Sequence, residues 1–342
     1  MKAAMARKTE DAITLHLEEI EKPVPAAGEV LVKVLYAGIC GTDMHIVTGH
    51  YKKAAFPLVI GHEFVGEVAE VGPFAETGLQ LGEKVAVHPI RTCGKCDACL
   101  AGMENICEEL SIIGCQENGG FAEYVSVPAS KVIRLPQDID MELAGLLEPL
   151  AIAVHDVHAS GLMIGQNACI IGGGPIGILI ALVAKSAGAS VVVSEINGFR
   201  TDFIRSLGIE VIDPMQTDVG KEIAKRTDGK GVDVIFEVTG SKAGAAIMTQ
   251  LARRGGTIVS VGIPSEALPI DGSDVFMKEL RIRGVRLHHK SDFEHAIKIL
   301  ASGEIDDALR KFITKIYDLS DAEEAMRYAI EDQQHFKVLL KM

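Results

Sequence analysis

Four of the seven cysteines of the chain fall within one short stretch, TCGKCDACLAGMENICE. Their spacing is C-x2-C-x2-C-x7-C, formed by Cys93, Cys96, Cys99 and Cys107. Thiolates are soft ligands, and four of them close a tetrahedron around Zn2+. We therefore predict a structural zinc site, which leaves no coordination position for a substrate. An iron–sulfur cluster, a disulfide pair or buried structural cysteines are the alternatives.

A second group of residues has the types found at catalytic zinc. Cys40 lies in the segment AGICGTDMH, and His62 and Glu63 lie in IGHEFVGEV between two apolar, strand-like runs. Three protein ligands and one open position are the pattern of catalytic zinc, and thiolate, imidazole and carboxylate all bind this ion. The alternative is that His62 is a hydrogen-bonded turn residue and Cys40 a small packed hydrophobe.

A dinucleotide fingerprint follows in the segment NACIIGGGPIGILIALVAKSAGASVVVSE. A strand over 168–171 runs into a G-x-G-x-x-G turn, a helix is predicted over 178–187, and a second strand over 191–193 ends near an acid. The start of the helix would face a diphosphate. We assign cofactor binding to Gly172, Gly174, Pro175, Ile176, Gly177, Glu195 and Arg200. Glu195 favours NAD over NADP because a 2′-phosphate would meet like charge, and Arg200 weakens that preference.

The remainder of this half alternates between strand-like and helix-like runs. Strands are predicted over 231–240, 255–264 and 280–286, and a helix over 242–254. Such alternation predicts a parallel, doubly wound sheet, whose ligands bind at the carboxyl ends of the strands. Residues at two of these strand ends are therefore expected near the nicotinamide: Val261, Gly262, Ile263, Val285 and Arg286.

The first 140 residues contain short β-like runs broken by glycine and proline, which predict a compact β-barrel-like domain with long loops. The chain becomes helical after Lys290 and is expected to return to this domain. At 342 residues it is too long for one typical core. We predict two domains: 1–149 with 287–342, carrying a zinc lobe at about 90–110, and 150–286.

Composition and charge narrow the classes of function. The formal net charge of −13 disfavours nucleic acid or an anionic membrane surface as the partner. No apolar run reaches the roughly 18 residues of a membrane span, and the first residues lack the apolar core of a secretory signal. We therefore expect a cytoplasmic protein, whose thiols stay reduced.

These segments together resemble the zinc-dependent medium-chain alcohol dehydrogenases, along essentially the whole chain. The resemblance is carried by GICGTDMH, GHEFVGEV, the four-cysteine lobe, LLEPLAIAVH and GGGPIGILIALVAKSAGA. It implies a GroES-like catalytic domain, a Rossmann NAD-binding domain, two zinc ions and a homodimer or homotetramer. CGTDMHI and SEINGFR are similar to threonine dehydrogenases. LEPLAIAVH and the short loop VTGHYKKAAFP are more similar to polyol dehydrogenases of the sorbitol or butanediol type.

The resemblance also implies a mechanism. Zinc held by Cys40, His62 and Glu63 binds the substrate oxygen and favours the alkoxide. Thr42 takes the hydroxyl proton and passes it through the nicotinamide ribose to His45, while hydride moves to NAD+. A turn hydroxyl is the structural alternative for Thr42.

The substrate hypothesis depends partly on Glu148, an exchanging or adjacent zinc ligand by resemblance and otherwise a helix-start carboxylate. Simple alcohol enzymes have cysteine there, so we expect a polyol or sugar-derived secondary alcohol. Alternatives are a threonine or sugar-acid dehydrogenase and, in a different class, a binding protein or zinc-independent reductase. Arg286, His288 and His289 either approach the nicotinamide, favouring a sugar acid or phosphorylated polyol, or form a solvated or subunit-facing basic stretch.

Overall fold

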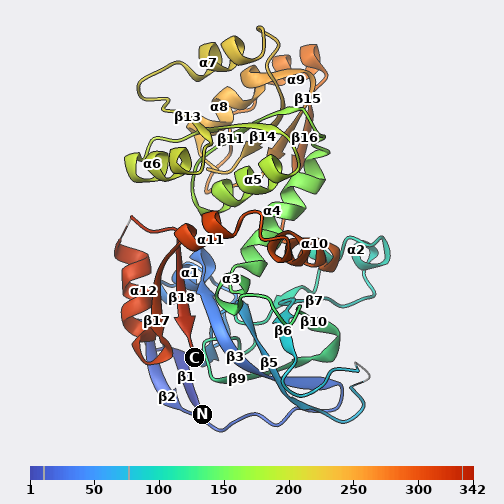
Figure 1. The fold of residues 1–342 in the computed structure, drawn as a ribbon, viewed down its shortest axis with the longest axis vertical. Coiled ribbons are helices and arrows are strands. Elements are labelled where there is room, and N and C mark those ends of the chain that lie inside the picture. The colour runs from blue at the N-terminus through green and yellow to red at the C-terminus, as the bar shows by residue number, and fades with distance from the viewer. Residues whose placement is uncertain (11, 76–77, 333) are drawn as a thin grey trace. The chain divides into compact units, whose positions relative to one another are not determined.

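The computed structural model describes residues 1–342 except 11, 76–77 and 333 (Figure 1). The chain divides into two compact units, one made of Met1–Glu148 and His289–Met342 and the other of Pro149–His288. Among the described residues, no helix has the length and apolar character needed to cross a membrane.

The first unit is built on three sheets. The largest runs in the order β10 (Val132–Arg134), β6 (Lys84–Val87), β5 (Glu63–Val71), β3 (Glu29–Ile39), β18 (Lys337–Lys341) and β17 (Ile313–Asp318), and β9 (Tyr124–Pro128) also pairs with β3. A second sheet has the order β2 (Ile13–Glu19), β1 (Lys2–Lys8) and β4 (Leu58–Val59), and the third pairs β7 (Ile90–Arg91) with β8 (Ser111–Ile112). Buried aliphatic side chains from the two larger sheets form one core with residues of α12 (Ala322–Glu331).

The helical segments of the first unit are short. They are α1 (Gly41–Val47), α2 (Asp97–Leu100), η1 (Glu104–Ile106), η2 (Ala129–Lys131), α3 (Met141–Ala144), α10 (Lys290–Ala301), α11 (Asp306–Phe312), η3 (Leu319–Asp321) and α12. The longer helix α4 (Leu147–Ser160) begins at the end of the first unit's N-terminal part.

The C-terminal segment is only partly helical, which corrects the expectation that the chain is helical after Lys290. Helices α10, α11 and α12 are present, but β17 and β18 join the large sheet, parallel to each other, and β18 lies antiparallel to β3 (Figure 1). Because Lys337 to Leu340 are all buried, β18 lacks the alternation of polar and apolar residues that identifies a half-exposed strand. The strand brings Lys337 to the end of β3.

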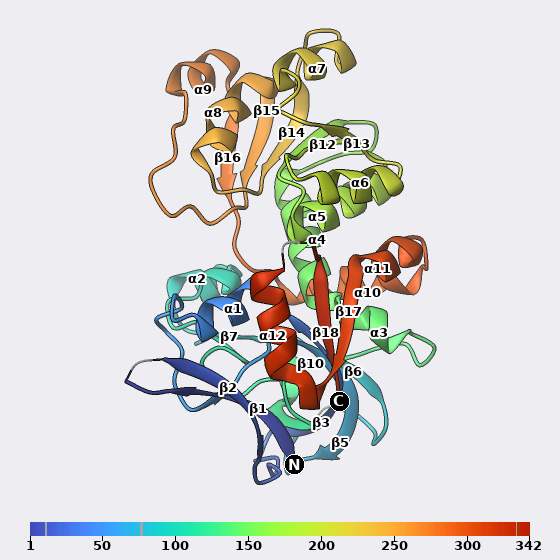
Figure 2. The same ribbon diagram turned by 90° about the vertical axis from the view of Figure 1, so that its left-hand side faces the viewer.

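The second unit has one parallel six-stranded sheet. The strand order is β13 (Glu210–Ile212), β12 (Ser190–Ser194), β11 (Asn167–Ile171), β14 (Val232–Glu237), β15 (Ala252–Ser260) and β16 (Arg281–Gly284). Helices α5 (Pro175–Ser186) and α6 (Gly198–Ser206) cover one face. Helices α7 (Val219–Arg226), α8 (Lys242–Leu251) and α9 (Gly272–Lys278) cover the other (Figures 1 and 2). The order reverses between β11 and β14, the switch point where a doubly wound fold binds dinucleotides.

Two predicted helix boundaries in this unit are wrong. The helix predicted over 242–254 ends at Leu251, because Ala252 already pairs with Val232 in the sheet. The helix predicted over 178–187 begins earlier, with Pro175 in its first turn, where the missing N–H of proline costs no hydrogen bond.

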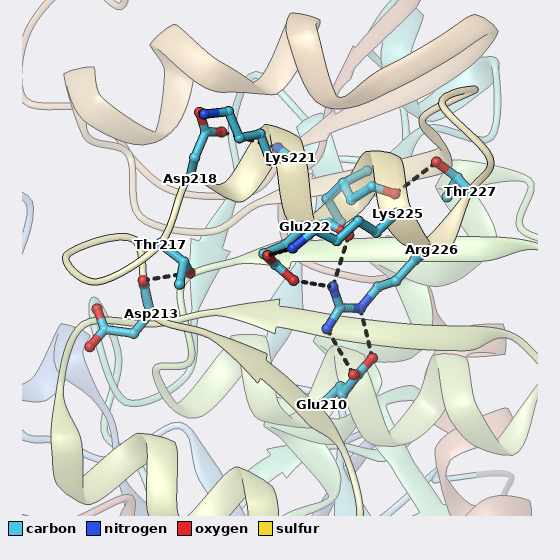
Figure 3. Close-up of polar contacts among 10 residues, drawn as sticks. Glu210, Asp213, Thr217, Asp218, Lys221, Glu222, Lys225, Arg226 and Thr227 are labelled. Carbon is cyan, nitrogen blue, oxygen red and sulfur yellow. Dashed lines mark hydrogen bonds and ion pairs between the residues drawn. The ribbon is translucent and has the colours of Figure 1, made fainter.

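Charged side chains fix α7 to the outermost strand β13 (Figure 3). Arg226 donates to both carboxylate oxygens of Glu210, at 2.7 and 2.8 Å, and to the backbone oxygen of Glu222 at 2.8 Å. Asp218 caps the helix by accepting a hydrogen bond from the backbone N–H of Lys221. Bidentate pairs of this kind fix geometry as well as charge, so α7 is tied to the amino end of β13.

Candidate zinc and dinucleotide sites

Cys40, His62 and Glu63 come together in the first unit. Cys40 is the N-cap residue of α1 and directly follows β3, while Glu63 opens β5. Strands β3 and β5 are antiparallel, with Gly38 opposite Glu63, so the two segments meet at this end of the sheet. The sulfur, nitrogen and carboxylate ligand atoms lie within 4.8 Å of one another. Such a donor set suits zinc.

Asp43, which the sequence analysis missed, orients this cluster. Its two carboxylate oxygens accept the N–H of Cys40 at 2.8 Å and that of Gly61 at 3.2 Å, and one of them lies 3.6 Å from Nδ1 of His62. Burial alone would lower the pKa of His62, but the negative charges of Asp43 and Cys40 raise it well above its usual value. Histidines that bind metals commonly present their second ring nitrogen to a carboxylate.

Lys337 is the second residue that the sequence analysis missed. Its Nζ lies 2.6 and 2.9 Å from the two carboxylate oxygens of Glu63 and 3.3 Å from the backbone oxygen of Ile39. Lys337 is 4% and Glu63 1% exposed. Burial raises the pKa of Glu63, the positive charge of Lys337 lowers it, and the negative charge of Glu148 raises it further. The net shift of this pKa is upward. A divalent cation and Lys337 together carry three positive charges, which would balance the thiolate of Cys40 and the carboxylates of Glu63 and Glu148.

Close packing leaves little space around Glu63. A Cβ at Gly38 would lie 2.2 Å from Oε2 of Glu63, so glycine is needed opposite it. Glu148, the second residue of α4, is buried and close enough to affect the pKa of Glu63. Its carboxylate is not among the ligand atoms that cluster within 4.8 Å in the described part of the chain. The structure therefore groups Glu63, rather than Glu148, with Cys40 and His62.

The two residues of the predicted proton relay lie on α1, three positions apart, which makes them neighbours on one helix face. Thr42 is half-buried and His45 is exposed. The chain folds back after the helix, so that the N–H of Tyr51 donates to the backbone oxygen of His45 at 2.9 Å, and the ring of His50 lies 5.9 Å from that of His45. A proton on His45 can therefore exchange with solvent.

The four-cysteine lobe forms a second cluster around α2 and η1. The sulfur atoms of Cys93, Cys96, Cys99 and Cys107 lie within 4.8 Å of one another, and all seven cysteines are free thiols. Hydrogen bonds from the backbone N–H groups of Glu108 and Cys99 lower the pKa of Cys96 to about 6, whereas desolvation and the neighbouring thiols raise that of Cys99 to about 12. Four sulfur atoms this close could hold a metal ion between them as thiolates. The disulfide alternative is excluded in this structure.

The glycine turn after β11 forms a tight cradle at the start of α5. Gly172 has a φ of 105°, and a Cβ there would lie 2.7 Å from Cγ2 of Thr239. A Cβ at Gly177 would lie 2.0 Å from the backbone oxygen of Gly172. Gly174 is the N-cap residue, and Pro175 and Ile176 open the helix. The turn and the N–H groups of the first helical turn fit a diphosphate.

Glu195 lies beside this turn at the end of β12. One carboxylate oxygen accepts the N–H of Gly173 at 2.7 Å, and the other accepts those of Ile196 and Asn197. Arg200 Nη1 lies 3.9 Å from the same carboxylate, and its Nε is buried without a hydrogen-bond partner. A cationic side chain therefore stands next to the acid.

Comparison with known proteins identifies the family. Residues 26–137 match the family model for the alcohol dehydrogenase GroES-like domain, and residues 175–302 match that for zinc-binding dehydrogenases. A protein named 2-dehydro-3-deoxy-L-galactonate 5-dehydrogenase, from Pseudoalteromonas atlantica, is 44% identical over 93% of this chain and 92% of its own length. The chain belongs to the zinc-binding medium-chain dehydrogenases. The predictions of this family, of an enzyme, and of a GroES-like domain with a Rossmann sheet are confirmed.

Further relatives of this dehydrogenase differ in substrate. L-threonine 3-dehydrogenase from Pyrococcus abyssi is 38% identical over 87% of each chain. A solved zinc-binding dehydrogenase from Sinorhizobium meliloti, bound to NADP, superimposes with a TM-score of 0.91 at 32% identity, covering 100% of this chain and 99% of that one. The family therefore includes different substrates and at least one NADP-bound member.

The strand ends of the dehydrogenase's Rossmann sheet gather the remaining predicted cofactor residues. Val261 and Gly262 follow β15, both N–H groups donate to the backbone oxygen of Glu237, and Ile263 is 95% exposed. Val285 follows β16 and donates to Ser260 at 3.2 Å.

The basic run after β16 is not uniformly solvated, which corrects one of its two predicted roles. Arg286 is exposed, but His288 is buried, and His289 is the N-cap residue of α10. The backbone N–H of His289 donates to Asp292 at 2.9 Å. The expectation of a solvated stretch is therefore wrong for His288, and His289 begins α10.

Proposed function

We propose that this dehydrogenase oxidises a secondary alcohol of a polyol or sugar-derived substrate with NAD+. The observation that carries the proposal is the cluster of Cys40, His62 and Glu63 in one unit, combined with a dinucleotide cradle in the other. The relative from Pseudoalteromonas atlantica is named for a sugar acid, which supports a hydroxylated substrate. L-Threonine is the second candidate, because the Pyrococcus abyssi relative is named for it.

The proposed mechanism divides the work among residues of the first unit. Bound zinc would supply Lewis-acid chemistry that lowers the pKa of the substrate hydroxyl, and NAD+ would accept hydride. Cys40, His62 and Glu63 would hold the metal. Thr42 would accept the hydroxyl proton while donating its own onward, and the exposed His45 would release a proton to water. Glu148 adds negative charge near the site as an adjacent or exchanging ligand.

We propose that the four-cysteine lobe binds a second, structural zinc and that the protein is cytoplasmic. Free thiols throughout the chain suit a reducing compartment. The closed set of four sulfurs leaves no position for substrate, so this metal would stabilise the lobe and take no part in catalysis.

For the cofactor, we propose NAD rather than NADP. Glu195 lies beside the glycine turn, where it would repel a 2′-phosphate, although Arg200 stands next to it. We assign dinucleotide contacts to the turn at Gly172, to the residues after β15, and to Val285 and Arg286 after β16. Comparing kcat/KM for NAD+ and NADP+ tests this preference, and a higher value for NADP+ would contradict it.

We also propose that two copies pair through β16. It is an edge strand whose four residues are all exposed, and unpaired strand edges are normally protected. Phe276 is 82% and Met277 60% exposed on the adjacent α9, and Ile282 on β16 is also exposed. Exposed large apolar side chains on an edge strand and on the helix that precedes it support a protein interface. Light scattering should show a dimer or tetramer, and Ile282→Lys should shift it to smaller species.

A substrate panel tests the proposed activity. NADH formation is followed with polyols, aldonic acids, L-threonine and simple primary alcohols. We expect turnover with polyols or sugar acids and little with primary alcohols. Turnover confined to L-threonine would contradict the proposed substrate class, and a lack of turnover with every alcohol would favour a binding protein.

A further inference from the structure

Glu237 is a buried carboxylate that has no role in the proposed zinc sites or in the glycine turn. It is the last residue of β14 and is 0% exposed. Its Oε1 accepts hydrogen bonds from the N–H of Thr239, at 3.0 Å, and from the Thr239 hydroxyl, while Oε2 accepts the N–H of Gly240 at 3.1 Å. These partners all belong to the turn that follows β14. Because burying a carboxylate is costly unless it is hydrogen-bonded, the turn after β14 must be held in one conformation.

The turn held by Glu237 packs against the residues that follow β15. The backbone oxygen of Glu237 accepts the N–H groups of Val261 and Gly262 at 2.8 and 2.9 Å. A Cβ at Gly262 would lie 2.1 Å from the backbone nitrogen of Gly240, and a Cβ at Gly240 would lie 2.8 Å from the oxygen of Ile263. The two backbones are therefore in direct contact, so that a shift of the turn would displace residues 261–263.

The same turn packs against the diphosphate cradle on its other side. Val238 donates to the backbone oxygen of Ile171, the last residue of β11, at 3.0 Å. Cγ2 of Thr239 occupies the space that a Cβ at Gly172 would need, and a Cβ at Gly244 would lie 2.6 Å from both Oε1 of Glu237 and the Thr239 hydroxyl. The carboxylate therefore fixes Thr239, and Thr239 lies directly against the first glycine of the cradle.

We propose that Glu237 is a positioning residue. It sets the distance between the diphosphate cradle at Gly172 and residues 261–263, which are expected beside the nicotinamide. It acts through Thr239 and Gly240 without touching the cofactor. The adenosine end is served by Glu195 and Arg200, which follow a different strand. Glu237 therefore matters for the nicotinamide half of the cofactor more than for the adenosine half. The inference rests on the proposed binding of NAD and is independent of the substrate.

Glu237→Gln tests this because the amide keeps the shape of the side chain but turns one acceptor into a donor. That donor would face the N–H of Gly240 or the groups of Thr239, so the turn must shift. Dissociation constants are measured by calorimetry for NAD+, NADH and ADP-ribose, which lacks nicotinamide. We expect about a tenfold rise in Kd for NAD+ and NADH, with a smaller rise for ADP-ribose, which has the diphosphate but no nicotinamide.

Two variants control the experiment. Glu210→Gln makes the same chemical change in the same unit, at the amino end of β13, where it breaks the pair with Arg226 (Figure 3). It should leave all three dissociation constants unchanged. Thr239→Val removes one hydrogen bond to Glu237 and keeps the branched shape beside Gly172. It should raise the Kd for NAD+ and NADH by less than Glu237→Gln does. It also provides the test if Glu237→Gln does not fold.

Two results would overturn the inference. Equal weakening of NADH and ADP-ribose would mean that Glu237 only supports the fold of the unit, and unchanged binding of all three ligands would mean that the turn is held without it. A wild-type protein that binds ADP-ribose but neither NAD+ nor NADH would contradict the proposed cofactor, and the inference with it. A protein that binds NAD+ but oxidises no polyol or sugar acid would contradict only the proposed substrate.

Discussion

Replacing Lys337 with methionine tests how strongly the buried ion pair with Glu63 stabilises the first unit. The pair is short, at 2.6 Å, and the two side chains are only 5% and 1% exposed. In protein freed of zinc by a chelator, methionine fills similar space but leaves a buried carboxylate without its cation, a change that costs about 3–5 kcal/mol. That is a large share of the roughly 5–15 kcal/mol that stabilises a typical protein. Lys337→Met should therefore lower the unfolding midpoint of the first unit markedly.

The assay is urea unfolding followed by far-UV circular dichroism, since the chain has no tryptophan. Lys95→Met is the matched control, because the pair of Lys95 with Glu109 is long, at 3.4 Å, and largely exposed. We expect the control to cost less than about 1 kcal/mol. If Lys337→Met loses as little unfolding free energy as Lys95→Met, the buried pair of Lys337 and Glu63 does not stabilise the first unit as argued.

A double variant separates the ion pair from packing. Lys337→Met combined with Glu63→Gln removes both charges, so no uncompensated ion remains buried. The double variant should be more stable than the sum of the single losses predicts, by at least about 2 kcal/mol. Additivity within about 0.5 kcal/mol would mean that the two side chains do not interact energetically.

Three further predictions follow from the sites. Cys40→Ala should abolish NAD+ reduction with little change in melting temperature, whereas Cys96→Ala should lower the melting temperature; equal thermal stability of the two variants would contradict these roles. Asp43→Asn should weaken zinc binding at the Cys40 cluster by about 10–100-fold, measured by competition with a chelator. Despite burial, hydrogen bonds lower the pKa of Asp233, so its stabilisation is present above the unfolded pKa of about 4 and is lost as pH falls through the folded value. Asp233→Asn should therefore lower stability at pH 7 and reduce its loss in acid, and unchanged acid sensitivity would contradict this.

The parts of this dehydrogenase that could be predicted from sequence are those that depend on local motifs. The cysteine lobe and the glycine turn each lie within a short stretch, so that spacing alone indicates their geometry. The alternation of strands and helices in the second half likewise predicts the doubly wound sheet. Cys40 and His62 were identified by residue type and by their apolar flanks, although only the pairing of β3 with β5 explains why they meet.

Sequence analysis missed residues whose roles arise from contacts between segments that are separated in the chain. Lys337 reaches Glu63 because β18 pairs with β3, and β18 has no alternating pattern that would reveal it. Asp43 lies within the GICGTDMH motif, but its role follows from burial and from its contact with His62. Glu237 ends an ordinary apolar strand, and nothing in its neighbours indicates that its carboxylate organises the following turn.

We propose that the Cys40, His62 and Glu63 cluster binds a catalytic zinc, separate from the metal of the cysteine lobe. Zinc content per chain, measured by mass spectrometry on the purified protein and on His62→Ala, tests it most directly. The two clusters predict two zinc ions in the wild type, and one, with loss of NAD+ reduction, in the variant. A single zinc ion in the wild type, or a His62→Ala protein that keeps both ions and its activity, would contradict the claim.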